Sequence, residues 1–515
     1  MCARRLFSFA LLAICIVQCA NAQSNLPNPF DVVPYSAIQQ SGVLAGSVAS
    51  VTSYNGPICD LAPPPGSTTP PCTNSELSNP SNWKPQSGIL NLAGSLNGSI
   101  ATALSVIPLA SPASGVITKI DPTTGAELPS SSTLGPIFTE RAETIGKHKF
   151  YIGLSNQDFH FKSFNGQSLK TITLLDPGGA STNIEAGGKP LTTFPTTLND
   201  TANVSLSQDV AFLTYGITGR FDVSVGLPIV HAAVSSQTSN GLIYVGDGFN
   251  NNKNGNCWCL DTFTPGVAPV NGSGLTVAQV NYSSSSKTGF GDLLLRFKGN
   301  VLEARTVALA LGADLRLPTG DERNFLGTGA IAVKPFAALS LYTKPWSNGV
   351  VFSPHLNVGW QIAGKSILGG QLTATPIMVD GFAALGPPFP STKDYLPDVF
   401  SWAAGTEVAL GRHNTVVVDV LGNQIGWIHG IQGLMNGSVA NVPLPQSTVG
   451  AAPQLVTASG LLSAGRVSFG QYSGAFGYKA RIVANLVATF NMLVRFDNNG
   501  LTARATPLYG LSYTF

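Results

Sequence analysis

Residues 307–317 read VALALGADLRL, and this stretch decides the fold class. Apolar side chains stand at every second position: Val307, Leu309, Leu311, Ala313, Leu315 and Leu317. The positions between them hold small or charged side chains: Ala308, Ala310, Gly312, Asp314 and Arg316. Because successive side chains of a β-strand point to opposite faces, a period of two separates these sets as no helix would. The stretch therefore predicts a strand with one apolar and one polar face.

The same alternation recurs in residues 221–229, 352–362, 400–408, 482–496 and 501–515. The strands that contain it are long, roughly 11 to 16 residues, whereas globular strands average about 5 to 6 and a membrane strand needs about 9 to 11. Their polar face carries glycine, serine, threonine and few charges, which suits a narrow lumen. Since backbone groups in lipid must all be paired, such strands have to close on themselves. We predict an all-β fold: a transmembrane antiparallel up-and-down β-barrel of about 12 strands (12–14).

The connections between strands test this prediction. We place strands near residues 148–163, 203–217, 220–231, 288–298, 303–317, 329–343, 349–363, 398–410, 414–427, 457–471, 477–496 and 500–515. Tight turns are expected around Gly219, at 299–302, 344–348 and 411–413, and near Tyr472; the longer connections are 164–202, 232–287, 318–328, 364–397 and 428–456. Outer-membrane barrels alternate short periplasmic turns with long external loops in this way. Two irregularities remain, the short external hairpin at 497–500 and a slip of the apolar phase between Leu154 and Phe159.

Composition excludes several classes of protein. Of 515 residues only 10% are charged, and 28 basic against 26 acidic residues leave a net charge of +2. Disorder through high net charge is excluded, and so is the basic footprint of a nucleic-acid-binding protein. The mean hydropathy is +0.20. No apolar run in the sequence reaches the 18 residues or so that a membrane helix needs.

The N-terminus carries the pattern of a secretory signal peptide. Arg4 and Arg5 precede an apolar stretch at 6–17, and Ala20-Asn21-Ala22 provides a small-residue cleavage site before Gln23. We therefore expect three parts: a signal peptide at 1–22, an N-terminal segment at 23–147 and the barrel at 148–515. This order predicts export to the outer membrane of a Gram-negative-type bacterium.

Four cysteines remain once the signal peptide is removed. Cys59, Cys72, Cys257 and Cys259 would reach an oxidising compartment, so we expect disulfides. Cys59 with Cys72 would close a proline-rich loop, whereas Cys257 and Cys259 could pair with each other only under strain. Nearby ligands for a metal site are lacking, and no metal or other cofactor is predicted.

The segment at 23–147 does not alternate. A proline-rich stretch is followed by apolar residues at helical spacing, which end at Pro108: Leu92, Leu96, Ile100, Ala103, Leu104 and Ile107. An amphipathic helix is therefore expected. Two alternatives stay open for the segment: a periplasmic arm, or a plug that enters the lumen.

The strand pattern points eight charged or titratable side chains inward. These lumen-lining candidates are Asp314, Arg316, His355, Glu407, Asp419, Arg481, Arg495 and Arg504. They either pair with one another and stiffen the lumen, or set the size and charge filter of a pore. His355 could also serve as the base of a hydrolase if a serine lay beside it at the lipid edge. The other histidines show no metal-binding spacing.

The chain ends on alternating aromatic and leucine residues. Tyr509, Leu511, Tyr513 and Phe515 resemble the C-terminal assembly signal of outer-membrane barrels, which implies that the barrel-assembly machinery is a partner. Other aromatic residues fit the girdles at the two membrane interfaces: Trp346, Trp402, Trp427, Tyr342 and Tyr513.

Residues 359–366 match the phosphate-loop pattern G-x-x-x-x-G-K-S. Such a loop must follow a buried strand and open a helix whose N-terminus meets the phosphates. Here the loop positions continue a strand of period two and lead into Ile367-Leu368-Gly369-Gly370, which has no helical pattern. We therefore reject nucleotide binding.

Four segments resemble a known family. They are residues 135–147 (GPIFTERAETIGK), 215–223 (YGITGRFDV), 289–293 (GFGDL) and 317–322 (LPTGDE). These segments are similar to outer-membrane proteins grouped under the meta-pathway of phenol degradation, a group loosely similar to fatty-acid and aromatic-hydrocarbon transport barrels. The resemblance covers residues from about 112 to the end. It implies an outer-membrane location and a role in uptake of hydrophobic or aromatic small molecules.

The leading hypothesis is therefore an outer-membrane channel, without catalysis, for passive uptake of small hydrophobic or aromatic solutes. Its expected partners are outer-membrane lipid, these solutes and the assembly machinery, with no nucleic acid. The alternative is a non-transporting surface scaffold or adhesion barrel that acts through its long loops. A barrel lipase or acyltransferase is a third possibility.

Overall fold

The computed structural model describes most of the chain. The described residues are 28–32, 34, 52–54, 57–60, 65–71, 73–77, 83–85, 87–108, 111, 118–120, 127–129, 133–176, 180–186, 189–192, 196–240, 281–343, 350–373, 376–379, 382–385, 388–411, 413–433, 442–443, 455–456, 461–483 and 485–515. The predicted signal peptide, Cys72, Cys257, Cys259 and Trp346 lie outside them.

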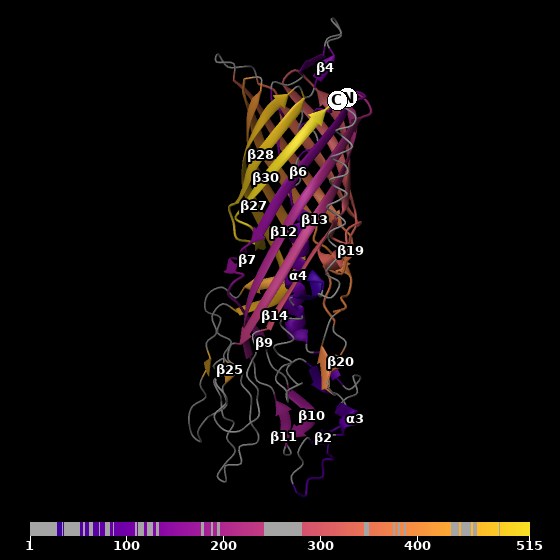
Figure 1. Ribbon diagram of the computed structural model, residues 1–515, viewed down its shortest axis with the longest axis vertical. Helices are drawn as coiled ribbons and strands as arrows, with labels where there is room; N and C mark the ends of the chain where they lie inside the picture. The colour runs from indigo at the N-terminus through magenta and orange to yellow at the C-terminus, as the bar shows by residue number, and fades with distance from the viewer. Residues whose placement is uncertain are drawn as a thin grey trace.

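The predicted barrel is confirmed as a closed antiparallel wall of twelve strands (Figure 1). The wall consists of β6 (Phe150–Phe161), β12 (Thr196–Gly216), β13 (Phe221–Asn240), the broken strand β14 (Asn281–Phe290) with β15 (Leu293–Glu303), β16 (Val307–Leu317), β17 (Ala332–Leu341), β18 (Val351–Ala363), β23 (Val399–Leu410), β24 (Asn414–Gly433), β27 (Leu461–Val483), β28 (Leu486–Arg495) and β30 (Ala505–Thr514). Each strand pairs with its neighbour in the chain. The last strand, β30, pairs with β6 from Leu508↔Gln157 to Thr514↔Tyr151 and closes the wall.

Short and long connections alternate as predicted. The short turns lie at the end that carries the C-terminus, here called the turn end, and the long connections lie at the opposite, loop end (Figure 1). Two of the predicted turns are wrong. Residues 299–302 belong to β15, where a bulge near Val301 interrupts the register and leaves Val301 and Leu302 both exposed.

The turn predicted near Tyr472 is also wrong, because β27 runs straight through it to Val483. The glycines that suggested a turn make room for aromatic rings instead. A Cβ on Gly470 would lie 2.8 Å from the Tyr472 hydroxyl, and a Cβ on Gly474 would collide with the Phe496 ring.

The apparent slip of the apolar phase in the first strand has another cause: the surroundings of the strand change along its length. Burial in β6 alternates without interruption from Tyr151 to Phe161. Toward the turn end the apolar side chains point outward, with Leu154 53% exposed, whereas near the loop end Phe159 points inward and is 7% exposed. The same exchange occurs on β12, where Leu213 is exposed but Leu206 is buried. The apolar set therefore moves from the outer face to the lumen within one strand.

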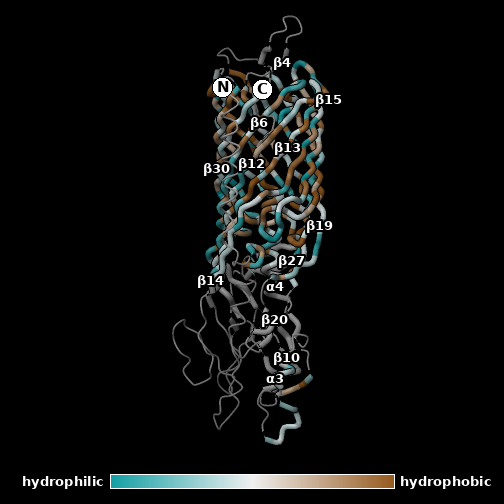
Figure 2. Tube along the Cα trace, turned by 45° about the vertical axis from the view of Figure 1, so that its right-hand side comes forward, coloured by the Kyte–Doolittle hydropathy of each residue, from teal (hydrophilic) through white to brown (hydrophobic). Residues whose placement is uncertain are grey.

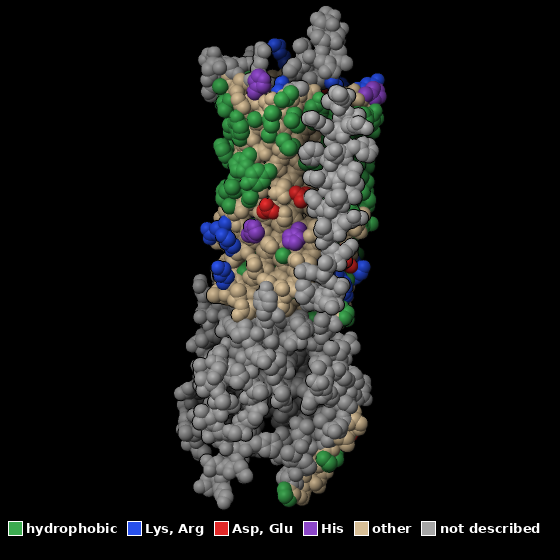
Figure 3. All heavy atoms as spheres, in the orientation of Figure 1, with side chains coloured by type: hydrophobic (Ala, Val, Ile, Leu, Met, Phe, Trp, Pro, Cys, Tyr) green, Lys and Arg blue, Asp and Glu red, His purple; other side chains and the backbone are tan. Residues whose placement is uncertain are grey.

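This exchange marks the edge of the apolar band. The outer face turns polar where Asn156 donates to Asp209 Oδ1 at 2.9 Å across β6 and β12. Figure 3 shows hydrophobic side chains over the turn-end half of the barrel and acidic and histidine side chains beyond them. Along the strands themselves, hydrophobic and hydrophilic residues alternate (Figure 2). A closed wall with such a band is the form in which β-strands cross a membrane.

The apolar inward residues near the loop end pack against the N-terminal part of the chain. The long helix α4 (Ser87–Val106) buries Leu96, Ile100 and Leu104 in one cluster with Phe159, Phe161 and other wall residues. Its polar residues Asn97 and Thr102 are buried too, so most of residues 94–106 of this helix is enclosed. Pro108 lies just beyond it, as predicted. No helix among the described residues is long and apolar enough to cross a membrane.

The remaining elements are small and lie mostly beyond the wall at the loop end. They are β1 (Thr52–Tyr54), β2 (Cys59–Asp60), α3 (Asn74–Leu77), β3 (Trp83–Pro85), β4 (Thr118–Ile120), β5 (Glu127–Pro129), β7 (Ser163–Phe164), β8 (Gln167–Ser168), β9 (Ile172–Asp176), β10 (Ala180–Ala186), β11 (Lys189–Thr192), η3 (Glu322–Asn324), β19 (Lys365–Ser366), β20 (Pro376–Val379), β21 (Phe382–Leu385), β22 (Asp394–Tyr395), β25 (Val442–Pro443), β26 (Leu455–Val456) and β29 (Leu501–Thr502). Cys59 is disulfide-bonded, in agreement with the expected oxidising compartment. Residues 359–363 belong to β18 and lead into β19, so the phosphate-loop match is part of a strand.

Candidate functional site

The lumen holds two blocks of the N-terminal chain. The first block, here called the lumen segment, comprises residues 133–147 and lies toward the turn end, where it bonds to inward side chains of the wall. The second, here called the outer plug, comprises residues 28–32 and 87–108 and lies toward the loop end. Both blocks consist of residues that sequence analysis left open between an arm and a plug.

Arg141 forms the central contact of the lumen segment. Its guanidinium donates to both carboxylate oxygens of Glu407, at 3.1 and 2.7 Å. Both side chains are almost fully buried, with 1% and 0% exposure. Nε2 of His355 lies 2.8 Å from Glu407 Oε1, the oxygen that also accepts from Arg141 Nε. A buried bidentate pair of this kind positions the segment in the wall with high geometric specificity.

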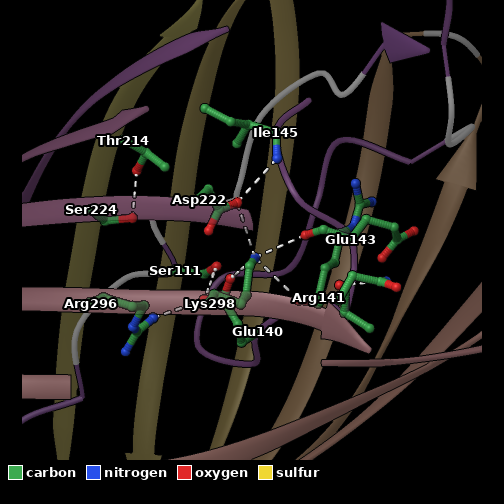
Figure 4. A network of polar contacts seen from close by, with 12 residues as sticks. Ser111, Glu140, Arg141, Glu143, Ile145, Thr214, Asp222, Ser224, Arg296 and Lys298 are labelled. Atoms are coloured by element: carbon green, nitrogen blue, oxygen red, sulfur yellow. Dashed lines mark hydrogen bonds and ion pairs between the residues drawn. The ribbon is translucent and has the colours of Figure 1, made fainter. Parts of the chain in front are cut away.

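Glu140 occupies a second cluster, drawn in Figure 4. It accepts from Lys298 Nζ at 2.7 Å and from Arg296 at 2.8 Å. Ser111 donates to it at 2.8 Å. Burial alone would raise the pKa of Glu140, but the charges of Lys298 and Arg296 outweigh it and hold the pKa below its ordinary value of 4.5. Glu140 is therefore a carboxylate that the wall cations bind.

Backbone groups of the lumen segment are also bonded to the wall. The Phe138 N–H donates to Asp419 Oδ2 at 3.2 Å, and Lys479 Nζ donates to the Pro136 carbonyl at 2.6 Å. Near the turn end the Ile145 N–H donates to Asp222 Oδ2 at 3.2 Å. The inward polar face of the wall therefore provides the partners that buried backbone requires.

The four segments that resemble a family meet in two pairs. Thr144 of the lumen segment donates to the Gly219 carbonyl of the β12–β13 hairpin at 2.8 Å. Asp292, at the break between β14 and β15, accepts from the Gly320 N–H at 3.2 Å. The Thr328 N–H and hydroxyl also donate to Asp292, at 2.7 and 2.6 Å. These motifs are therefore structural junctions, in which protein donors occupy the Asp292 carboxylate.

The outer plug is tied to the loops around it. Asn97 of α4 donates to the Phe30 carbonyl at 2.9 Å, and Asp31 accepts from the Phe389 N–H at 3.1 Å. Burial raises the pKa of Asp31 above its ordinary value, against the opposing effects of the Phe389 N–H and Arg323. The Arg323 guanidinium lies over the Phe30 ring, 5.4 Å from its centroid.

A cavity of about 150 Å³ separates the two blocks. Ile107, Pro108 and Ser111 bound it on the N-terminal side. The wall contributes inward side chains of β15, β16, β17, β18, β23 and β24, among them Arg296, Asp314, Arg316, Lys334 and Phe336. Because residues of both N-terminal blocks and of six wall strands line it, the cavity lies inside the barrel between the two blocks.

Most of the predicted lumen residues are placed as the sequence indicated. Asp314, His355, Glu407 and Asp419 are buried at 7% exposure or less, and Arg316 lines the cavity. Arg481 is half-buried near the turn end of β27, and Arg495 donates to Asp497 Oδ1 at 2.9 Å beside the loop-end hairpin.

Arg504 is a correction. It is exposed and lies in the connection between β29 and β30, because β30 begins only at Ala505. The alternation predicted for 501–515 therefore holds from Ala505 onward, whereas Leu501 and Ala503 are buried against the outer plug. The Arg504 carbonyl accepts from the Arg495 N–H at 3.0 Å, but the Arg504 side chain is exposed and does not line the lumen.

Several important lumen residues were missed: Glu140, Arg141, Arg296, Lys298, Lys334 and Lys479. The two in the lumen segment lie outside any periodic pattern. Arg296 and Lys298 occur in β15 at the alternation that places Leu295 and Phe297 outward, so that register could have found them.

Some of the predicted outward aromatic residues lie on the outer face, and one does not. Tyr509, Leu511 and Phe515 are 50–53% exposed on the outer face of β30, and the Tyr513 and Phe515 rings lie 4.7 Å apart. Trp427 is 70% exposed. Tyr342 is wrong as a girdle residue, because it packs against the buried alanine cluster that includes Ala142 and Ala308. The role of the C-terminal residues in assembly stays a prediction.

Comparison with known proteins gives fold-level similarities. No protein-family model matches the chain, and no curated protein is similar to it. Among solved structures, an outer membrane channel from Pseudomonas putida F1 is 11% identical, with 73% of this chain and 98% of that chain covered and a TM-score of 0.37. A Pseudomonas aeruginosa FadL homologue is 12% identical over 79% and 98%, with a TM-score of 0.30. The CymD monoaromatic hydrocarbon channel is 8% identical over 72% and 88%, with a TM-score of 0.29.

These identities and TM-scores are low, so function has to be argued from the lumen. The closed wall and its apolar outer band define the class of protein, a membrane-spanning β-barrel. Among the described residues no cluster of three or more His, Cys, Asp or Glu side chains could hold a metal ion.

Proposed function

We propose that the protein is an outer-membrane channel for passive uptake of small hydrophobic or aromatic molecules, closed at rest by its own N-terminal segment. The observation that carries this proposal is the cavity enclosed between the outer plug and the lumen segment inside a complete wall. Bacterial single-chain barrels with such a band belong to the outer membrane. A solute would enter from the loop end, occupy the cavity and leave when the lumen segment moves.

The energetics permit such movement. The wall is held by its own backbone ladder, which continues around all twelve strands without using the lumen segment. The segment is held by hydrogen bonds and ion pairs and by buried apolar side chains such as Ile137 and Ile145. Each hydrogen bond that water can replace contributes only about 0.5 to 1.5 kcal/mol net. The segment can therefore leave the lumen while the barrel stays folded.

A reversible lock tests the proposal. The Ala142 N–H lies 2.9 Å from Ser340 Oγ, so a disulfide between Ala142→Cys and Ser340→Cys would hold the segment against β17. In liposomes, we expect the oxidised variant to block entry of a neutral aromatic such as toluene and the reduced variant to restore it. Wild-type protein treated with the same reductant controls for the native disulfide. Entry at the rate of empty liposomes through unlocked protein, or equal entry through locked protein, would contradict the proposal.

A hydrolase has one observation in its favour. Ser340 Oγ lies 2.9 Å from His355 Nδ1, and His355 Nε2 lies 2.8 Å from Glu407. However, Ser340 is fully buried beneath Ala142 and faces the lumen rather than the lipid, and Glu407 is already bound by Arg141. We therefore expect no labelling by a fluorophosphonate probe; labelling that is lost in Ser340→Ala would favour catalysis instead.

The scaffold alternative rests on the long connection at 232–287, of which residues 241–280 lie outside the described residues. It stays a prediction, and the lumen geometry gives it no support.

A further inference from the structure

The charges around the central cavity do not balance. Two carboxylates, Glu140 and Asp314, face it together with three cations, Arg296, Arg316 and Lys334. Arg296 serves both carboxylates, because it binds Asp314 at 2.6 and 2.8 Å and Glu140 at 2.8 Å. One positive charge is therefore in excess, and Arg316 and Lys334 are the two cations that no carboxylate contacts directly.

Arg316 and Lys334 have no carboxylate of their own. Among the described residues, neither makes an ion pair within 4.0 Å, and the only hydrogen bond of Arg316 is a 3.4 Å contact with the Leu104 carbonyl. Their strands are adjacent, with Asp314 opposite Lys334 and Arg316 opposite Ala332. The two cations thus occupy neighbouring inward positions on one stretch of wall.

A glycine in the neighbouring strand leaves room for the Lys334 side chain. A Cβ on Gly359 of the next strand, β18, would lie 2.7 Å from Lys334 Cε. The absence of a side chain at this position lets Lys334 lie across β18 beside the cavity. A cation withdrawn from water in this way is costly unless an anion binds it.

Apolar groups complete the cavity. Ile107, Phe336 and Leu421 line it beside the two cations. A cavity of about 150 Å³ with partly apolar walls has the volume that one benzene ring needs. The site therefore combines room for a single ring with two cations, Arg316 and Lys334, that make no ion pair within 4.0 Å among the described residues.

From this geometry we propose that the cavity binds a single-ring aromatic carboxylate, with its carboxylate at Arg316 and Lys334 and its ring against Phe336 and Leu421. This inference rests on the proposed channel function and narrows its substrate class. Carboxylate and guanidinium groups form charge-assisted hydrogen bonds, which are about twice as strong as neutral ones. A neutral ring of the same size would use only the apolar part of the site.

Binding to the purified full-length protein in detergent tests this directly, with equilibrium dialysis of radiolabelled benzoate as the probe. We expect saturable benzoate binding that is weakened roughly tenfold or more in Lys334→Met, as loss of one charged hydrogen-bonding partner implies. Lys334→Arg, which keeps the charge, should retain binding. The matched control is Lys365→Met, since Lys365 is exposed and lies over the Tyr395 ring away from the cavity.

Competitors distinguish the chemistry of the ligand. Excess unlabelled benzoate should displace the probe, whereas toluene, acetate and inorganic phosphate at equal concentration should not. Displacement by phosphate as effective as by benzoate, or equal binding in Lys334→Met and wild type, would overturn the inference. Heat-modifiable migration on gels verifies that each variant is folded, and Arg316→Met provides a second, independent test if Lys334→Met fails to fold.

The two proposals can fail separately. If benzoate does not bind but toluene still enters liposomes through unlocked protein, the carboxylate site is wrong and the channel stands. If benzoate binds but no solute crosses, the site stands and the channel is wrong.

Discussion

Single residues decide how firmly the lumen segment is held, and Arg141 is the first to test. Replacing it with methionine leaves the buried Glu407 carboxylate without its bidentate partner. Removing one member of a buried ion pair costs about 3 to 5 kcal/mol. We expect Arg141→Met to release the segment and raise single-channel conductance in planar bilayers.

The control for this variant is Lys147→Met, an exposed position at the end of the same segment. The double variant Arg141→Met/Glu407→Gln should recover part of the closure, because it also removes the unpaired charge. Unchanged conductance in Arg141→Met would show that the ion pair does not hold the segment.

We expect the ionisation of Glu140 to control how the channel responds to acid. Its pKa is held below 4.5, so its bonds to Lys298 and Arg296 are present above that pH and are lost only as the pH falls through the lowered pKa. Conductance should therefore stay constant from neutral pH to 4.5 and rise below it. Glu140→Gln should conduct more at neutral pH and lose most of the rise in acid. A rise that begins near neutral pH would contradict this assignment.

At the scale of elements, Asp292 lies at the break between β14 and β15 and binds the connection at 318–331 to the wall. Its carboxylate accepts three hydrogen bonds from that connection. Asp292→Asn would turn one acceptor into a donor facing N–H groups, at a cost of about 1 to 3 kcal/mol. We expect faster tryptic cleavage after Arg323, with Asp398→Asn, an exposed position, as the matched control. Equal cleavage rates would indicate that the connection is held by other contacts.

The elements also show what the sequence could and could not predict. Period-two alternation identified the wall because one face of each strand meets lipid, as in residues 307–317. It failed at Tyr472, where glycines resemble a turn but accommodate rings. It also appeared to slip after Leu154, because there the apolar partner of the strand changes from lipid to α4.

The contacts of the candidate site were harder to predict. The inward charges Asp314, Glu407 and Asp419 followed from strand register, which is local. Their partners Glu140 and Arg141 belong to an aperiodic segment whose place is set by bonds to residues more than 150 positions away. A local sequence pattern cannot predict contacts between residues so far apart in the chain.

For the whole molecule, closure depends on the last strand. The Phe515 N–H donates to the Phe150 carbonyl at 2.8 Å, where the last and first strands meet. We expect Phe515→Ser to lower the amount of folded protein in the outer membrane several-fold, measured by heat-modifiable migration of membrane fractions. Phe496→Ser is the control, because Phe496 is 64% exposed but does not end the chain. Equal levels of both variants would argue against a terminal assembly signal.

The unequal lengths of the strands have a consequence for how solutes arrive. β12 and β13 contain 21 and 20 residues, whereas β6 between β12 and β30 contains 12. At about 3.3 Å per residue and a tilt near 40°, strands of 20 residues rise roughly 50 Å, about twice the height of an apolar band. The surplus forms a collar with a water-facing exterior, which includes the exposed Asp209 and His231. A compound dissolved in the bilayer meets the closed wall below this collar, so entry through the mouth favours compounds with enough aqueous solubility to approach from above.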